Sequence, residues 1–225
     1  YYEYIVYILK CNYMIRDKDL AELAGIVLGD GSLYVNSKHK VRQFVITGHI
    51  KNDLKYFREF VLPLLERNFG RKFQLNFDID SNAIRIKSQK SEVINKIVEL
   101  GIPVGNKLEN NVKIPEWIFS DKDLIKVCIR GLIDTDGSIS PITGRNYPYI
   151  WFVSQIQGLQ ESFSRAMKIL DFKTSSWSHR ANHGSQIYLG AKSMVEKYFN
   201  EINFNNPYHK HRFMLLSSSS VKDTE

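Results

Sequence analysis

Two aspartates, Asp30 and Asp136, occupy matching positions in this chain of 225 residues. Each lies in a nonapeptide, LAGIVLGDG or IRGLIDTDG, and each directly precedes a glycine. Carboxylate oxygens are the ligands that Mg²⁺ and Mn²⁺ prefer, and such ions can activate water and stabilise a leaving oxygen in phosphodiester hydrolysis. If the repeat brings the two acids together, the sequence predicts a shared divalent-metal centre.

The position of the two acids favours chemistry over a simple turn. Asp-Gly is a common helix stop, and a glycine at that point can adopt the left-handed turn that closes a helix. A carboxylate there faces the negative end of the helix dipole, at a cost of about 0.3–1 kcal/mol unless a cation is near, and two such carboxylates repel each other. A shared divalent cation removes both penalties. We therefore expect Asp30 and Asp136 to bind the metal, with backbone carbonyls near Gly29 and Thr135 as further ligands.

Small residues recur four positions apart in both nonapeptides: Gly25 and Gly29 in the first, Gly131 and Thr135 in the second. Positions four apart share one face of a helix, so these residues form a smooth stripe. Glycine inside a helix costs about 0.5–1 kcal/mol relative to alanine, and two of them require a packing reason. Close contact between two helices at an internal two-fold axis supplies that reason.

The elements around the nonapeptides repeat as well. Each nonapeptide follows Asp-Lys-Asp-Leu, an acidic entry typical of a helix N-terminus. The strand-like stretches that follow are 32–47, 72–88, 138–155 and 174–190, and the helix-like stretches are 53–67, 91–100, 158–170 and 192–202. The pattern predicts an α+β fold of two pseudo-symmetric αββαββα halves.

This order also sets the expected domain boundaries. The first half covers 16–102 and the second half 118–216, joined by a connector at 103–117 that contains proline and glycine. Residues 1–15 form an N-terminal extension and residues 217–225 a flexible tail.

Alternation of apolar and polar residues is clearest from 72 to 79. It predicts a strand whose buried face carries Phe73, Leu75, Phe77 and Ile79, with a polar face on the other side.

Composition favours a polyanionic partner. Lys and Arg number 31 against 24 Asp and Glu, which gives a formal net charge of +7. Two cysteines cannot form a framework of disulfides, which favours a reducing, intracellular location. The apolar run at 1–15 is interrupted by Glu3 and Lys10 and is too short to span a bilayer, so we expect no membrane partner.

With these motifs the chain resembles the LAGLIDADG homing endonucleases, in the monomeric form that carries both motifs on one polypeptide. The segments IPEWIF (114–119) and NPYHKHRF (206–213) are also similar to that family, and the resemblance covers about residues 17–214. It implies two four-stranded antiparallel sheets that form a DNA-binding saddle, joined by a two-helix interface, and a staggered cut across the minor groove. By that analogy Asp30 and Asp136 bind the metal, with Mg²⁺ as cofactor, Mn²⁺ as a substitute, and Ca²⁺ binding without cleavage.

The resemblance further implies catalytic basic or amide residues at strand ends near the metals, where they position water and stabilise the scissile phosphate. Gln155 and Lys87 are the best candidates in this chain, followed by Lys192. Gly48 stands where a glutamine is common in the first half, and Gly190 stands at the position that would match Lys87. The polar residues around the two acids are therefore expected to differ between the halves.

The expected DNA-binding residues lie on the strand-like stretches, because their polar and aromatic side chains bond phosphates and base edges. They are Tyr34, Lys38, Lys40, Arg42, Gln43, Gln74, Asn76 and Arg85 in the first half, and Arg145, Tyr147, Tyr149, Trp151, Ser176, Ser178, Arg180, Gln186 and Tyr188 in the second.

The sequence thus predicts a sequence-specific, metal-dependent double-strand DNA endonuclease that acts as a monomer on a long asymmetric site and is encoded within an intron or intein. One alternative is an RNA maturase on the same fold, with intron RNA as its partner. Another is a catalytically inactive DNA-binding protein. Retention of both Asp30 and Asp136 favours the nuclease. We expect it in the cytoplasm or in an organelle with access to DNA.

Overall fold

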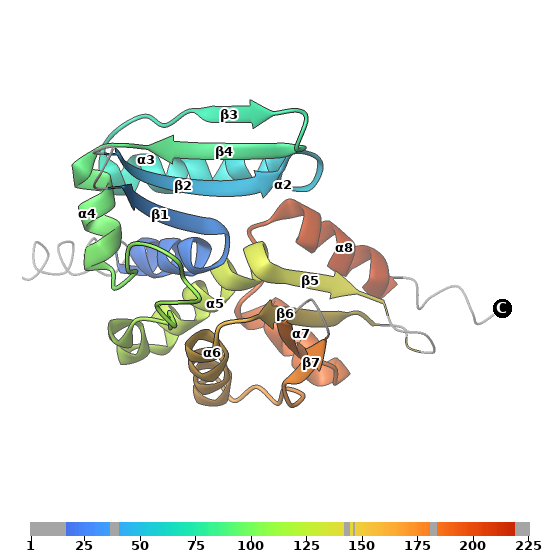
Figure 1. Ribbon diagram of the computed structural model, residues 1–225. Coiled ribbons are helices and arrows are strands. Elements are labelled where there is room, and N and C mark those ends of the chain that lie inside the picture. The colour runs from blue at the N-terminus through green and yellow to red at the C-terminus, as the bar shows by residue number, and fades with distance from the viewer. Residues whose placement is uncertain (1–16, 37–40, 142–144, 146, 181–183, 219–225) are drawn as a thin grey trace, which may run out of the picture.

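The computed structural model describes residues 17–36, 41–141, 145, 147–180 and 184–218. Within these residues the chain forms two similar halves, each built from a long helix, a four-stranded antiparallel sheet and further helices (Figure 1). The predicted α+β fold of two αββαββα halves is confirmed. The extension predicted for 1–15 lies outside the described residues.

The two nonapeptides end the two helices that lie between the sheets (Figure 1). The first motif helix spans residues 17–30, and the second is α5 (Lys122–Asp136). In the first, residues 21–28 are all buried, because protein packs against every side of that helix. The Asp121 side chain begins α5 by accepting a 2.6 Å hydrogen bond from the backbone N–H of Asp123.

The first sheet has the strand order β1-β2-β4-β3 and the second the order β5-β6-β8-β7. The first contains β1 (Gly31–Asn36), β2 (Val41–His49), β3 (Leu75–Asp78) and β4 (Ala83–Ser88). The second contains β5 (Gly137–Ser140), β6 (Tyr149–Ser154), β7 (Ser178–Arg180) and β8 (Gly184–Leu189). In both, the strand that follows the motif helix lies nearest the middle of the molecule (Figure 1).

Helices cover one face of each sheet. They are α2 (Ile50–Tyr56), η1 (Phe57–Val61), α3 (Leu62–Phe69) and α4 (Ser91–Glu99) in the first half, and α6 (Gln157–Ile169) and α7 (Lys192–Glu201) in the second. Helices α2, η1 and α3 are continuous, and η1 is a π-helical turn between the two α-helical segments. Because Pro63 has no N–H to donate and its ring clashes with the previous turn, the wider π turn before it relieves the helix.

Two further helices lie outside the repeat: η2 (Glu116–Ser120), a 3₁₀ turn before α5, and α8 (Pro207–Ser218) at the end of the described chain. The sequence reasoning did not predict α8, which places residues 217–218 in a helix and not in the tail, while 219–225 lie outside the described residues. Among the described residues, no helix is both long enough and apolar enough to cross a membrane.

The apolar sides of the strands face the helices, as in Ile84 and Ile86 of β4, which are fully buried. The expectation for 72–79 is wrong at its end, because Phe77 is 46% exposed and Ile79 77% exposed. Strand β3 stops at Asp78, so Ile79 lies in the turn that follows, and β3 is the outermost strand of its sheet.

Candidate active site at the ends of the motif helices

The two motif helices cross with their backbones in contact. A Cβ added to Gly25 would overlap the carbonyl oxygen of Cys128, and one added to Gly131 would lie 2.6 Å from the carbonyl oxygen of Glu22. A Cβ on Gly29 would overlap Oγ1 of Thr135. The small stripe of each helix therefore lies against the other helix, which brings the two C-terminal ends side by side.

Asp30 and Asp136 meet at these ends. The carboxyl carbon of Asp136 lies 3.5 Å from the position of a Cβ on Gly29, the neighbour of Asp30. Asp30 is half-buried and Asp136 is exposed. Both acids therefore sit where the two halves join, directly before β1 and β5.

The sequence suggested that the glycines after the acids close the helices with a left-handed turn. The structure shows that they do not. Gly137 has φ −89° and ψ 169°, which is extended backbone, and Gly31 is not among the glycines with positive φ. A Cβ on Gly31 would lie 2.6 Å from the Cα of Val27, and one on Gly137 would lie 2.8 Å from the Cα of Ile133. Glycine is needed because each strand leaves its helix so sharply that the chain touches the previous turn.

Burial disfavours ionisation of both acids, and like charges add to the effect at Asp30. Burial, followed by the carboxylates of Asp136 and Asp53, raises the pKa of Asp30 to about 8, while Lys107 opposes the rise. Burial raises the pKa of Asp136 to about 6, again against the charge of Lys107. Asp136 keeps exposed surface, but it lines a cavity of about 450 Å³, so surrounding protein displaces much of the bulk water.

This donor set fits a divalent cation. A dication stabilises the ionised forms of two adjacent carboxylates that otherwise repel each other, and carboxylate oxygens suit Mg²⁺ or Mn²⁺. In the part of the chain that the structure describes, no group of three or more His, Cys, Asp or Glu residues is placed to hold a metal ion. The described chain thus offers two carboxylates, Asp30 and Asp136, and leaves room for oxygens from other sources.

Lys107 is a functional candidate that the sequence reasoning missed. Its ammonium donates hydrogen bonds to the carbonyl oxygens of Leu28 at 2.7 Å, Val27 at 3.4 Å and Gly29. It therefore supplies, at the end of the first motif helix, the cation that the helix dipole favours. The carbonyl of Gly29, suggested above as a metal ligand, here accepts a hydrogen bond from Lys107. Burial lowers the pKa of this lysine, and Asp136 and Asp30 oppose that effect.

Comparison with solved structures places this geometry in a known fold. The chain is similar to I-DmoI in complex with DNA and Ca, with a TM-score of 0.62, 16% identity, and coverage of 89% of this chain and 97% of that one. It is also similar to I-WcaI bound to its DNA recognition sequence, with a TM-score of 0.58, 14% identity and coverage of 89% and 86%. The chain has the LAGLIDADG homing endonuclease fold.

The chain is also similar to proteins that are not named as homing endonucleases. The N-terminal LAGLIDADG domain of DUF199/WhiA is similar as well, with a TM-score of 0.57, 15% identity and coverage of 83% of both chains. Replication factor C small subunit of Methanocaldococcus jannaschii is 27% identical over 175 residues, which cover 70% of this chain and 9% of that protein. The chain thus spans about a tenth of that relative's length. No protein-family model matches the chain.

Gln155 shares a cavity with the acid of the second LAGLIDADG helix. Asp136, Lys107, Gln155, Leu28 and Leu159 are among the residues that line this space of about 450 Å³. Gln155 is exposed, so its amide is accessible from solvent. The structure therefore brings this predicted catalytic residue together with one acid, and adds the ammonium of Lys107 from the connector.

The register of the two sheets revises the predicted match between the halves. Gly31 pairs with Ile46 in the first sheet, and Gly137 pairs with Phe152 in the second. Counting on from these partners, the residue that corresponds to Gln155 is His49 and not Gly48. The Nε2 atom of His49 lies 2.9 Å from the side-chain nitrogen of Asn82.

The next strands revise the match for Lys87 as well. Ile46 pairs with Ile86, and Phe152 pairs with Ile187, so the residue equivalent to Lys87 is Tyr188 and not Gly190. The repeat is offset by 106 residues up to β2 and β6 but by 101 in β4 and β8. A fixed offset from the nonapeptides therefore fails beyond the second strand.

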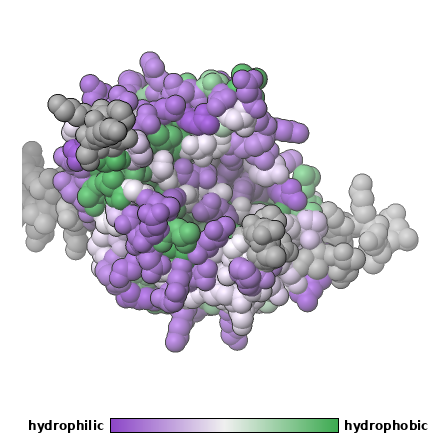
Figure 2. Space-filling view, in the orientation of Figure 1, coloured by the Kyte–Doolittle hydropathy of each residue, from purple (hydrophilic) through white to green (hydrophobic). Residues whose placement is uncertain are grey.

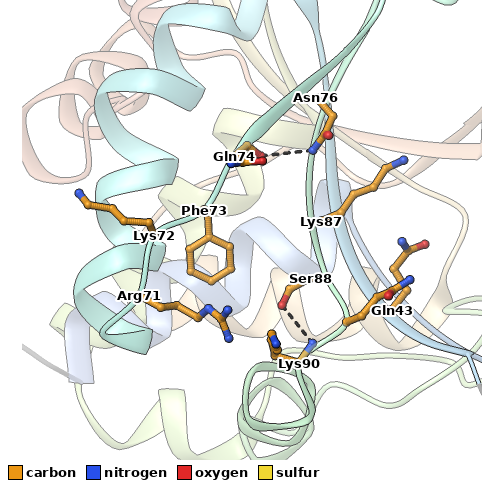
Figure 3. Close-up of a pocket in the computed structure, with 10 residues that line it drawn as sticks. Gln43, Arg71, Lys72, Phe73, Gln74, Asn76, Lys87, Ser88 and Lys90 are labelled. Atoms are coloured by element: carbon orange, nitrogen blue, oxygen red, sulfur yellow. Dashed lines mark hydrogen bonds between the residues drawn. The ribbon is translucent and has the colours of Figure 1, made fainter.

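Lys87 lies on the open face of the first sheet, in a polar cavity of about 460 Å³ (Figure 3). Gln43, Gln74 and Asn76, all from the expected DNA-binding set, line the same cavity. Lys192 is not brought to the acids: it begins α7, and its ammonium lies 3.9 Å from the carboxylate of Glu196.

The remaining predicted DNA-binding residues are distributed over both sheets. Tyr34 and Arg42 are exposed, whereas Arg85 forms a 2.7 Å ion pair with Asp78 on the neighbouring strand. Ser176 and Ser178 are exposed, and Gln186 is half-buried. Lys38, Lys40 and the side chain of Arg180 lie outside the described residues.

The open face of the second sheet is aromatic. The rings of Tyr149 and Tyr188 stack at 5.0 Å between centroids, and Trp151 lies 4.5 Å from Tyr188. The Arg145 guanidinium lies 5.5 Å from the Tyr149 ring centre and donates a 2.9 Å hydrogen bond to the Tyr147 hydroxyl. Several predicted DNA-contact residues thus form one packed group.

A buried polar cluster ties the two LAGLIDADG helices together near the acids. Arg130 of α5 donates two hydrogen bonds, of 2.8 and 2.6 Å, to the Glu22 carboxylate of the first helix. Asn206, which is fully buried, donates to the Asp134 carbonyl at 3.1 Å and to Asp53 at 3.0 Å. Sequence reasoning missed all of these contacts, because they join residues from distant segments.

Proposed function

We propose that this protein is a site-specific DNA endonuclease that hydrolyses both strands of a long duplex site in a divalent-metal-dependent reaction and leaves staggered ends. The observation that carries the proposal is the pair of carboxylates, Asp30 and Asp136, held together where two touching helices end between two sheets. A pair of acids raised in pKa by burial is costly for stability and points to a function.

The two acids would hold the cation, which is expected to be Mg²⁺ with Mn²⁺ as a substitute. When bound, such an ion activates water and stabilises the leaving oxygen. Gln155 is placed to orient water or a phosphate oxygen by hydrogen bonding from its amide. Lys107 contributes positive charge beside a phosphate group drawn into the same cavity.

The open faces of the two sheets would contact duplex DNA. Figure 2 shows a mostly hydrophilic surface over this side of the molecule, with hydrophobic side chains in a few separate groups. Four cations, Arg71, Lys72, Lys87 and Lys90, line the cavity on the first sheet. Arg71 and Lys72 form ion pairs with Glu92 and Glu66. Lys87 and Lys90 are suited to phosphates, and the nearby amides are suited to base edges. Both acids belong to one chain, which is consistent with action as a monomer.

The chain matches only a small part of the replication factor C relative. This is consistent with an endonuclease segment that is encoded inside a longer gene product. This supports the expectation that the endonuclease is encoded within an intron or intein. The DNA target would then be the uninterrupted host sequence at the insertion point.

The experiment uses a plasmid that carries this uninterrupted sequence, incubated with the protein in Mg²⁺, in Ca²⁺ and in EDTA. We expect linear plasmid with Mg²⁺ alone, and bound but intact plasmid with Ca²⁺. Asp30→Asn and Asp136→Asn should each lower the cleavage rate by about 10³-fold or more while DNA binding in Ca²⁺ is retained.

Asp80→Asn is the matched control, because Asp80 is an exposed acid in the turn after β3. It should cut at the rate of the unmodified protein. Undiminished cleavage by either Asp30→Asn or Asp136→Asn would contradict the assignment. Binding of the site without cleavage in any metal would favour the inactive DNA-binding protein, and assistance to splicing by the Asn variants would favour the maturase.

A further inference from the structure

At three equivalent positions on the open faces, the second sheet carries an aromatic ring and the first sheet does not. The equivalence follows from the register, because Trp151 pairs with Ser138 and Val45 pairs with Ser32, and each serine follows the glycine after its acid. The equivalent pairs are Tyr149 with Gln43, Trp151 with Val45, and Tyr188 with Lys87. The second face therefore presents rings where the first presents an amide and a cation.

The three rings form one packed group, which we call the aromatic cluster (Tyr149, Trp151 and Tyr188). Trp151 lies 4.5 Å from Tyr188 and 5.8 Å from Tyr149, between ring centroids. A Cβ on Gly190 would lie 2.6 Å from the Tyr188 ring, so the glycine makes room for that ring. Tyr149 is 7% exposed, whereas Trp151 and Tyr188 are half-buried. Trp151 and Tyr188 thus offer preformed apolar surface, which loses little conformational freedom when a ligand covers it.

The polar groups beside the aromatic cluster are held at its edge or are short. The Arg145 guanidinium donates to the Tyr147 hydroxyl at 2.9 Å and to the Gly190 carbonyl at 3.0 Å, which fixes its charge at the edge. The neighbours on β5 are Ser138 and Ser140, whose hydroxyls extend less far from the sheet than the rings do. The centre of this face therefore offers apolar surface, and its edge offers positive charge.

The aromatic cluster is continuous with the surroundings of the paired acids. Val153 lies two residues after Trp151, on the same face of β6, and lines the cavity that contains Asp136. Strand β5, which carries the serines beside the rings, begins directly after Asp136. A DNA duplex whose scissile phosphates lie at the acids would therefore extend across the cluster. Duplex DNA is the ligand that this position favours.

The two faces match different groups on the edges of base pairs. The amides of Gln43, Gln74 and Asn76 lie on the first face around Lys87 (Figure 3), and one amide can bond both N6 and N7 of adenine. A Tyr or Trp ring has a single polar atom and cannot form such a pair of bonds. The apolar group that a base presents in the major groove is the C5 methyl of thymine, which apolar side chains contact. The aromatic cluster is complementary to that methyl group.

We propose that the second sheet recognises its half of the DNA target by apolar contact between the aromatic cluster and thymine methyl groups, whereas the first sheet reads its half by hydrogen bonds from amides. This rests on the proposed endonuclease function. It assigns Trp151 and Tyr188 as specificity-determining residues. Recognition of one half of the target then depends on methyl groups, and recognition of the other half on base nitrogens.

The test measures binding to duplex targets in Ca²⁺, with base analogues placed in one half of the target at a time. Deoxyuridine lacks only the thymine methyl and keeps the base pair. In the half bound by the second sheet, each deoxyuridine that replaces a contacted thymine should weaken binding by about fourfold. In the other half, deoxyuridine should have little effect, and 7-deazaadenine, which lacks N7, should weaken binding by about tenfold.

A crosslink assigns each half of the target to a sheet. In 5-iodouracil an iodine atom replaces the methyl group, and under ultraviolet light the base crosslinks to an aromatic side chain that it touches. Thymine positions that are sensitive to deoxyuridine should crosslink to Trp151 or Tyr188. Crosslinks from these positions to Tyr34 of the first sheet instead would contradict the proposal.

Three variants separate base recognition from a structural role. Trp151→Val copies the residue at the equivalent position of the first sheet, and it should abolish the deoxyuridine effect while the 7-deazaadenine effect in the other half remains. Trp151→Phe keeps an apolar ring without the N–H and should keep the deoxyuridine effect. Phe77→Val is the matched control, because Phe77 is an exposed ring on the outermost strand of the first sheet, and it should change no affinity.

Two results for these variants would overturn the proposal. Equal weakening of thymine and deoxyuridine targets by Trp151→Val would mean a structural role, and loss of the deoxyuridine effect in Trp151→Phe would mean that the indole N–H reads the base. Failure of the unmodified protein to cut its target in Mg²⁺ would refute the endonuclease. Cleavage of a target that tolerates deoxyuridine throughout, or that has no thymine in the half on the second sheet, would refute only the recognition of thymine.

Discussion

The open face of the first sheet carries cations and amides, whereas the equivalent face of the second carries aromatic rings. Lys87 lines a polar cavity in the first half, and its equivalent in the second, Tyr188, stacks on Tyr149. The strand order and register behind these faces are the same. The two halves therefore show that backbone pairing is retained while the chemistry of the face changes freely.

The helix crossing shows the opposite behaviour. Gly25 and Gly131 occupy equivalent positions, and each is held against the backbone of the other helix. No side chain fits at either point without moving a helix. The halves thus stay alike where main chain meets main chain, as well as at the paired acids Asp30 and Asp136.

The largest expected effect on stability comes from the Arg130–Glu22 ion pair, which joins the two halves and has no equivalent across the pseudo-two-fold axis. Arg130→Met should leave the buried carboxylates of Glu22 and Asp134 without their cation and lower the free energy of unfolding by about 3–5 kcal/mol. Denaturant unfolding measures this. Arg165→Met, which removes an exposed ion pair with Glu116, is the control and should cost less than about 1 kcal/mol. Equal losses of unfolding free energy in the two variants would mean that the buried cluster contributes no more than an exposed ion pair.

Close contact between the helices is the feature that both halves share. Gly25→Ala should lower the free energy of unfolding by about 3 kcal/mol, because the added methyl group meets backbone that cannot move aside. Thermal unfolding should shift down by about 6–12 °C. Gly29→Ala should also destabilise, but Thr135→Gly should rescue it in part, since that clash is with a side chain. Rescue of Gly25→Ala by Thr135→Gly would contradict this distinction.

Helix α8 belongs to the second half alone among the described elements, and it makes stability depend on pH through His209. Burial lowers the pKa of His209 to about 4, against an ordinary value near 6.5. Because the unfolded chain binds the proton more readily, stability is full above about pH 6.5 and falls as the pH drops toward 4. The loss attributable to His209 should be about 2 kcal/mol between pH 7 and pH 5.

His209→Gln should remove that part of the pH dependence. The measurement is the difference in unfolding free energy between the two proteins at each pH, which cancels the contributions of the buried acids. A constant difference from pH 7 to pH 5 would show that His209 does not carry the effect.

The smallest effect distinguishes the two sheet faces in DNA binding. Lys87→Gln should reduce the slope of log affinity against log salt by about 0.9, because one phosphate contact is lost. Tyr188→Leu should weaken binding without changing that slope, since the ring carries no charge. Titrations in Ca²⁺ at several salt concentrations measure both. A change of slope in Tyr188→Leu would mean that the aromatic group also organises phosphate contacts, such as those of Arg145.

The sequence predicts the acids, the strands and the small stripes because these repeat within short, regular elements. Lys107 and Asn206 could not be found in this way, since each bonds a carbonyl more than 70 residues away. Helix α8 did carry a local signal. The Asn206 side chain accepts a 3.0 Å hydrogen bond from the backbone N–H of Tyr208, and Pro207 follows it, which is a typical helix start.

The mismatch on the strands β4 and β8 has a physical origin. The connection between β2 and β4 is five residues longer than that between β6 and β8, as the change of offset from 106 to 101 shows. Which residues of β4 and β8 are equivalent is decided by the hydrogen-bonded register with the neighbouring strand, and not by the distance along the chain. An offset of 106 residues would match Lys87 to Ser193, whereas the hydrogen-bonded register matches it to Tyr188.

Because Asn206 lies late in the chain, the surroundings of the two acids are completed late during synthesis. Domains fold as they emerge from the ribosome, beginning at the N-terminus. The first half can bury its core early, but Asp53 at the start of α2 lacks its Asn206 partner until residue 206 has been made. The carbonyl of Asp134 waits for the same amide. A nascent chain therefore cannot complete the surroundings of its two acids before nearly all of the described sequence has left the ribosome.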